Sequence, residues 1–144
     1  MLQKRTILNR SQSIAVLHGG KRRATATVEL AVLLPVILII VLGSIESASM
    51  IFLRQALVQS AYEAAKVAVK TGDSTQSRNT ALAVTKGRRI NRVSINFEPT
   101  DVKNAKRGSL IRVNITAPGD TNSVIPFGVF RGRTISATAV MARE

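Results

Sequence analysis

A long apolar segment with almost no charge constrains this chain more than any other feature. Residues 24–45 carry a single charged side chain, Glu29, and residues 30–45 carry none. A helix of these 22 residues would be about 33 Å long, which matches the roughly 30 Å hydrocarbon core of a bilayer. Helices in soluble cores are seldom apolar on every face over such a length. The sequence therefore predicts a transmembrane helix over residues 24–45.

Residues 46–72 are expected to extend this helix in amphipathic form, because their apolar positions recur at helical spacing. The apolar face holds Met50, Leu53, Leu57, Ala61, Ala64 and Ala68. The opposite face holds Gln55, Gln59, Tyr62, Glu63, Lys66 and Lys70. The tripeptide Thr71-Gly72-Asp73 predicts the end of the helix.

Residues 73–144 are expected to form a small β-rich head. A short helix is predicted over residues 74–86, with Ala81, Leu82 and Val84 facing inward. Three later segments alternate between apolar and polar residues, which predicts an antiparallel sheet with one buried face: 93–97, 111–115 and 135–139. We expect the sheet to pack on the apolar stripe of residues 50–68. The predicted fold class is α+β, a long N-terminal transmembrane and amphipathic helix packed on a small antiparallel β-sheet.

Basic residues in front of the apolar segment predict its orientation. Residues 1–23 contain six Lys or Arg and no acid, and three of these cations occupy positions 21–23. Within about ten residues on the far side, Arg54 is the one cation. Because cations near a span favour the cytoplasm, residues 1–23 are predicted to be a basic cytoplasmic leader and the head to be extracytoplasmic. Gly19-Gly20 is expected to interrupt any helix in the leader.

A cleaved secretory signal is the alternative interpretation of the same segment. Ser47-Ala48-Ser49 supplies the small residues that a signal peptidase needs. Against it, the apolar run is longer than a usual signal core of about 7–15 residues. The amphipathic helix also follows without a break.

The composition gives no sign of catalysis or of a cofactor. The chain has no Cys, one His (His18) and eight scattered acidic residues, so no metal site, thiol nucleophile or acid–base pair is indicated. We therefore expect a protein that is not an enzyme and binds no cofactor. The net charge of +13 admits anionic partners. With one Tyr, four Phe and no Trp, the sequence offers little base stacking, and no specific nucleic acid is expected.

Four residues of the apolar segment and its border are candidates for helix packing. A carboxylate in lipid is costly and usually functional, but Glu29 can equally lie at the level of the head groups. Gly43 and Ser47 form a pair of small residues four apart, which allows close approach of another helix in a membrane. Glu46 lies near the far interface, where the cost of its charge is lower.

Several segments, taken in order, resemble the TadE-like family. They are residues 22–35 (RRATATVELAVLLP), Gly43-Ser44-Ile45-Glu46, Arg54-Gln55-Ala56-Leu57, residues 61–66 (AYEAAK) and residues 135–144 (ISATAVMARE). The resemblance covers residues 22–70 well and the end of the head loosely. Leu30 and Ala65 stand where the family commonly has Phe and Gly.

This resemblance implies a pilin-like pseudopilin of the tight-adherence (Flp) pilus system. The family's prepilin peptidase cuts before an apolar helix with Glu at the fifth mature position, which for Glu29 is between Ala24 and Thr25. Ala24 departs from the usual Gly. The implied function is a membrane-anchored structural component of pilus assembly or a related secretion apparatus. The implied partners are membrane lipid, other pilus or secretion subunits and a prepilin peptidase. A single-pass membrane protein whose basic extracytoplasmic domain binds anionic surface ligands is the alternative.

Overall fold

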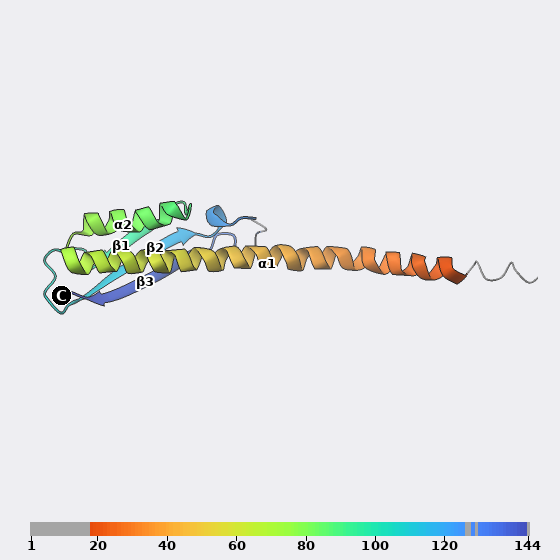
Figure 1. The fold of residues 1–144 in the computed structure, drawn as a ribbon, viewed down its shortest axis with the longest axis horizontal. Coiled ribbons are helices and arrows are strands. Elements are labelled where there is room, and N and C mark those ends of the chain that lie inside the picture. The colour runs from red at the N-terminus through yellow and green to blue at the C-terminus, as the bar shows by residue number, and fades with distance from the viewer. Residues whose placement is uncertain (1–17, 126–127, 129, 144) are drawn as a thin grey trace, which may run out of the picture. The chain divides into compact units, whose positions relative to one another are not determined.

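The computed structural model describes residues 18–125, 128 and 130–143, and the side chains from residue 25 onward. The chain divides into two units, Met1–Ile40 and Val41–Glu144, and each is described by itself. The elements follow one another as α1 (His18–Thr71), α2 (Ser74–Gly87), β1 (Ser94–Glu98), β2 (Leu110–Pro118), the short 3₁₀ helix η1 (Asp120–Asn122) and β3 (Thr134–Ala142) (Figure 1). This order confirms the predicted α+β fold class, with a long N-terminal helix and a small antiparallel sheet.

The start of α1 corrects one expectation about the N-terminal region. The helix begins at His18 and includes Gly19 and Gly20, so the prediction that these glycines interrupt a helix was wrong. Glycine costs roughly 1 kcal/mol against alanine in a helix interior. Both glycines lie in the first turn, where backbone N–H groups have no partner inside the helix. Little is lost there, and the apolar sequence that follows favours helix.

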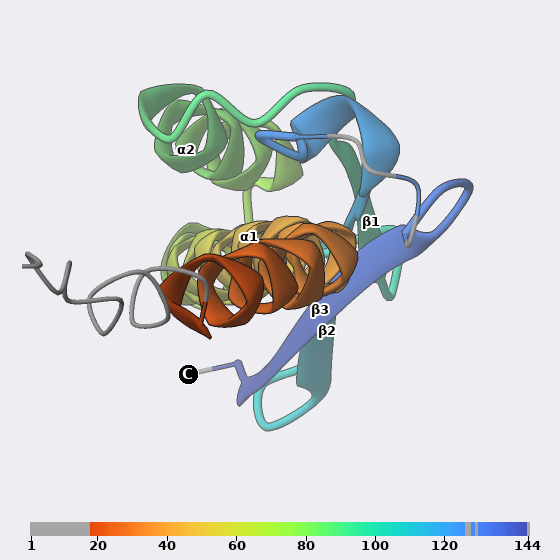
Figure 2. The same ribbon diagram turned by 90° about the vertical axis from the view of Figure 1, so that its right-hand side faces the viewer.

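In the unit Val41–Glu144, α1 packs against both α2 and the sheet (Figures 1 and 2). The predicted apolar stripe is buried at every position: Met50, Leu53, Leu57, Ala61, Ala64 and Ala68. The predicted polar face is exposed apart from the half-buried Glu63. The prediction that the sheet packs on this stripe is confirmed, because both contribute to one hydrophobic core.

The described residues form a sheet with the order β1-β2-β3 and antiparallel pairing throughout. The central strand β2 places Ile115 between Ile95 of β1 and Ala137 of β3. All three of these side chains are buried, as the alternation of apolar and polar residues predicted. The outward face carries polar residues such as Arg112 and Asn114. Since only one face is apolar, the sheet has to be covered on that side, and α1 covers it.

The turn between the two helices is fixed by local backbone chemistry. Gly72 adopts a φ of +67° and its N–H donates to the carbonyl of Ala68 at 2.9 Å, which ends α1. Asp73 then caps α2, because its Oδ1 accepts hydrogen bonds from the N–H groups of Thr75 (2.7 Å) and Gln76 (3.2 Å). The predicted helix end at residues 71–73 is confirmed.

Small side chains bring α2 close to α1. Ser60 Oγ of α1 donates to the carbonyl of Ala81 at 3.0 Å, and Ser77 Oγ of α2 donates to the carbonyl of Ala64 at 2.6 Å. The buried positions of α2 are Ser77, Ala81 and Thr85, whereas Leu82 and Val84 are only half-buried. The sequence identified Ala81 but missed the two hydroxyl residues, because a buried Ser or Thr leaves no mark in an apolar pattern.

The packing of the stripe is testable by introducing a charge. Leu57 is 0% exposed, whereas its neighbour Val58 is 50% exposed. We expect Leu57→Glu to unfold the head, since an unpaired carboxylate in the core costs several kcal/mol. Val58→Glu is the matched control and should leave the head resistant to protease. Limited proteolysis of the detergent-solubilised full chain measures both, and a protease-resistant head in Leu57→Glu would contradict the packing.

Candidate functional site

Between Leu30 and Ile40 the surface of α1 is apolar on every side. Each side chain from residue 25 to residue 40 is exposed, including a continuous run of Val, Leu and Ile. Among the described residues one helix, Thr25–Thr71, is long and apolar enough to cross a membrane. A helix surface of this kind is stable only in lipid or against other apolar helices. It is therefore a candidate membrane span, consistent with membrane anchoring.

Two predicted features lie in α1 just before this apolar surface. The predicted processing site, Ala24 and Thr25, falls within the helix, after its start at His18. Glu29 is exposed, and one turn further along α1 its neighbours are the exposed apolar residues Val32 and Leu33. The structure holds neither a peptidase nor a second subunit, and the roles of Ala24, Thr25 and Glu29 stay predictions.

Gly43 and Ser47 lie at the beginning of the unit Val41–Glu144. Ser47 Oγ donates to the carbonyl of Gly43 at 2.8 Å, so this hydroxyl is satisfied within α1. A Cβ atom placed on Gly43 would meet nothing within 4 Å. The surface at Gly43 is therefore open to the close approach of another helix, as a pair of small residues permits.

Glu46 has an internal contact that the sequence did not reveal. Its side chain is 2% exposed, and its Oε1 accepts hydrogen bonds from the N–H groups of Gly128 and Phe130, both at 3.3 Å. A buried carboxylate needs such donors. Glu46 therefore fixes the segment before β3 to α1, and its predicted role in packing between helices stays untested.

The anchored segment lies at the end of the mostly apolar sequence of residues 124–130. Phe130 packs against the hydrophobic core, whereas Val124 is 78% exposed. Residues 126, 127 and 129 lie outside the described residues. One end of the loop thus belongs to the core and the other faces solvent.

Arg143 is a second anchor that the sequence did not reveal. Its Nη1 donates to the carbonyls of Val102 (2.7 Å), Lys103 (2.8 Å) and Ala105 (2.6 Å). The guanidinium thereby gathers three carbonyl groups of one loop. The sequence shows only a cation after an apolar strand, and nothing in its spacing points to this contact.

The head offers no grouped set of metal ligands within its described part. No three His, Cys, Asp or Glu side chains of the described residues are grouped to hold a metal ion. The arrangement of residues instead defines an apolar helix fit for anchoring and a small α+β head built on its continuation.

The class defined by these features is a helix-anchored protein with a small head. Residues 24–66 match the model of the TadE-like protein family. The predicted resemblance to that family is confirmed over these residues, which include the apolar surface of α1 and most of the stripe under the head. Comparisons with curated proteins and with solved structures gave no match.

The anchoring role of Glu46 predicts how the loop responds to its loss. Glu46→Ala removes an acceptor whose hydrogen bonds are worth about 1.5–3 kcal/mol when charged. We expect the segment to open at least about tenfold more often, because the loss of even one such bond exceeds the roughly 1.4 kcal/mol that corresponds to one power of ten. Trypsin cleavage after the exposed Arg131 measures this opening. Glu46→Gln keeps an accepting oxygen and should change the cleavage rate less, and Glu63→Ala is the control for a carboxylate elsewhere on α1. Equal rates in Glu46→Ala and the unchanged chain would show that the two hydrogen bonds do not hold the loop.

Proposed function

We propose that this chain is a membrane-anchored, pseudopilin-like structural component of a Tad/Flp-type pilus assembly or a related secretion apparatus. One observation carries the proposal. The TadE-like match covers residues 24–66, and within it α1 exposes apolar side chains on every side up to Ile40. A segment of that family with such a surface fits a subunit that is held in the membrane and packs with other helices.

The proposed mechanism is structural rather than catalytic. The apolar part of α1 anchors the subunit, and the open surface at Gly43 admits a helix of another pilus or secretion subunit. The head then contacts assembly partners outside the cytoplasm. No step in this role needs an acid, a base or a metal ion.

Processing by a prepilin peptidase would supply a charge for Glu29. A cut between Ala24 and Thr25 leaves a positive amine on Thr25, about one helical turn before Glu29. A carboxylate within an apolar surface is stabilised by an opposite charge nearby. Pairing of Glu29 with the Thr25 amine of a neighbouring subunit would fix the axial register of the two helices.

The orientation of the head is testable with reporter fusions after residue 144. The three cations at positions 21–23 favour a cytoplasmic N-terminus. We therefore expect alkaline phosphatase to be active in the fusion and a cytoplasmic reporter to be inactive. The reverse pattern would place the head in the cytoplasm and exclude the proposed role.

If Glu29 pairs with a neighbouring subunit, its loss should impair association with other subunits but not insertion into the membrane. Glu29→Ala makes the segment more apolar, so the protein should still fractionate with membranes. We expect its recovery with pilus or secretion subunits to fall sharply, because the register-fixing charge is lost. Leu30→Ala, a neighbouring exposed position, is the control and should leave recovery unchanged.

N-terminal sequencing of the mature protein provides the independent check. The mature chain should begin at Thr25. An intact N-terminus would remove the amine on which the pairing depends, and unchanged recovery of Glu29→Ala would show that Glu29 takes no part in assembly.

A further inference from the structure

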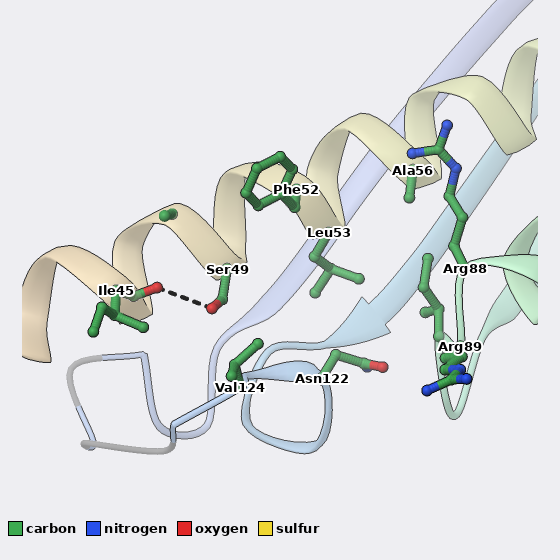
Figure 3. A pocket seen from close by; sticks show the side chains of 11 residues that line it. Ile45, Ser49, Phe52, Leu53, Ala56, Arg88, Arg89, Asn122 and Val124 are labelled. Carbon is green, nitrogen blue, oxygen red and sulfur yellow. Dashed lines mark hydrogen bonds between the residues drawn. The ribbon is translucent and has the colours of Figure 1, made fainter.

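A groove in the head combines an apolar wall with two arginines. It has a volume of about 570 Å³, within the usual range for small-molecule sites of about 300–1,000 Å³. One wall is α1 between Ile45 and Ala56, and the other is formed by Arg88, Arg89 and the segment with Asn122 and Val124. Figure 3 shows these side chains around the groove.

The groove changes from apolar to cationic along its length. Ile45 and Val124 lie at one end, Leu53 lies further along α1, and Arg88 and Arg89 lie at the other end (Figure 3). Among the described residues that line the groove, none is acidic. Its occupant should therefore have an apolar part and an anionic part, arranged in that order along α1.

The turn that carries the arginines is held in an unfavourable backbone conformation. Arg89 has a φ of +57° and Arg92 a φ of +55°, in the region that favours glycine. Asn122 clamps this turn, because its Oδ1 accepts from the N–H of Asn91 at 2.7 Å and its Nδ2 donates to the carbonyl of Asn91 at 3.0 Å. Side chains placed by such a clamped conformation are commonly functional.

Arg88 is also positioned by a direct contact. Its Nη2 donates to Oε1 of Gln59 on the exposed face of α1. The remaining N–H groups of this guanidinium stay available, since an arginine has five donors in a fork that matches phosphate oxygens. The cationic end of the groove is therefore fixed in place and suited to a phosphate group.

The apolar end of the groove begins where the candidate membrane span ends. Ile45 is the last residue of the predicted transmembrane segment, and Phe52, seven residues on, is 67% exposed. From Ile45 to Phe52 a helix rises about 10 Å, which brings Phe52 near the outer edge of the head-group layer. An exposed aromatic ring at that level is typical of the membrane interface. Arg88 and Arg89 line the groove together with Ala56, about one turn further along, where phosphate groups are within reach of an arginine side chain.

We propose that this groove binds one anionic phospholipid from the leaflet that faces the head. An acyl chain lies along Ile45, Leu53 and Val124, and the phosphate is held by Arg88 and Arg89. The inference rests on the membrane anchoring in the proposed function but not on pilus assembly. The bound lipid would orient the head on the membrane surface.

Native mass spectrometry of the full-length protein in a neutral detergent tests the proposal. Phosphatidylglycerol is the anionic probe and phosphatidylcholine the zwitterionic one. We expect the unchanged protein to retain one phosphatidylglycerol in preference to phosphatidylcholine. Arg88→Gln/Arg89→Gln should weaken phosphatidylglycerol binding roughly 25-fold, because each cation at an anionic lipid surface contributes about fivefold.

Two matched variants separate the groove from charge and from folding. Lys103→Gln/Lys106→Gln removes the same charge from exposed positions outside the groove and should keep the preference. Arg88→Lys/Arg89→Lys keeps the charge and should retain most of the binding even if the contact to Gln59 is lost. Val124→Gln removes part of the apolar lining and should weaken the binding of both phosphatidylglycerol and phosphatidylcholine.

Three results would overturn the proposal. One is equal phosphatidylglycerol binding by the Arg88→Gln/Arg89→Gln and Lys103→Gln/Lys106→Gln variants. Another is equal retention of the two lipids by the unchanged protein. The third is a lipid-free dimer that the groove variants dissociate, which would assign the groove to a second copy of the chain. A failure of the proposed function itself would appear separately, as loss of the protein from the membrane fraction.

Discussion

The rest of the head depends on the burial of the apolar stripe of α1. The segment of α1 from Met50 to Val69 buries its apolar residues against both α2 and the sheet. A small sheet with one apolar face is marginal without a cover, and α2 is too short to be stable alone. The sheet and α2 therefore both depend on packing against α1 for their stability. Leu57 of α1 is completely buried in the same core as Ile111 and Ile115 of β2.

The side chains of α1 change in size and exposure along the helix, and each stretch does something different. From Leu30 to Ile40 they are apolar and exposed, which suits lipid. Met50, Leu53 and Leu57 are the large inward residues of the next stretch, and with the sheet they build a core. From Ser60 to Ala68 the inward residues are small, so that α2 approaches closely enough for hydroxyl groups to bond to backbone carbonyls. One continuous helix thus serves as anchor, core and docking surface for a second helix.

Much of this fold could be predicted from the sequence, because periodicity reports which residues face inward. Alternation located Ile95, Ile115 and Ala137 on the buried face of the sheet, and helical spacing located the α1 stripe. The contacts of Glu46 and Arg143 could not be predicted, since each joins a side chain to backbone groups of a distant segment. Backbone donors and acceptors occur at almost every residue, so no residue pattern marks them.

The sequence likewise predicted one part of the candidate site and missed another. The apolar segment with Glu29 was evident, because twenty-two residues with one charge are rare outside membranes. The groove beside Arg88 and Arg89 was not, because its walls come from α1, the end of α2 and the segment near Asn122. In the sequence these arginines look like ordinary solvated cations. Only the fold brings them to an apolar surface.

The late position of β3 in the chain has a kinetic consequence. Its partner β2 is the central strand, and the segment leading into β3 is tied to Glu46 across more than 80 residues. Contacts between such distant residues form slowly. The buried face of the sheet is incomplete until β3 has paired with β2, so the head can close only after residues 134–142 have been synthesised.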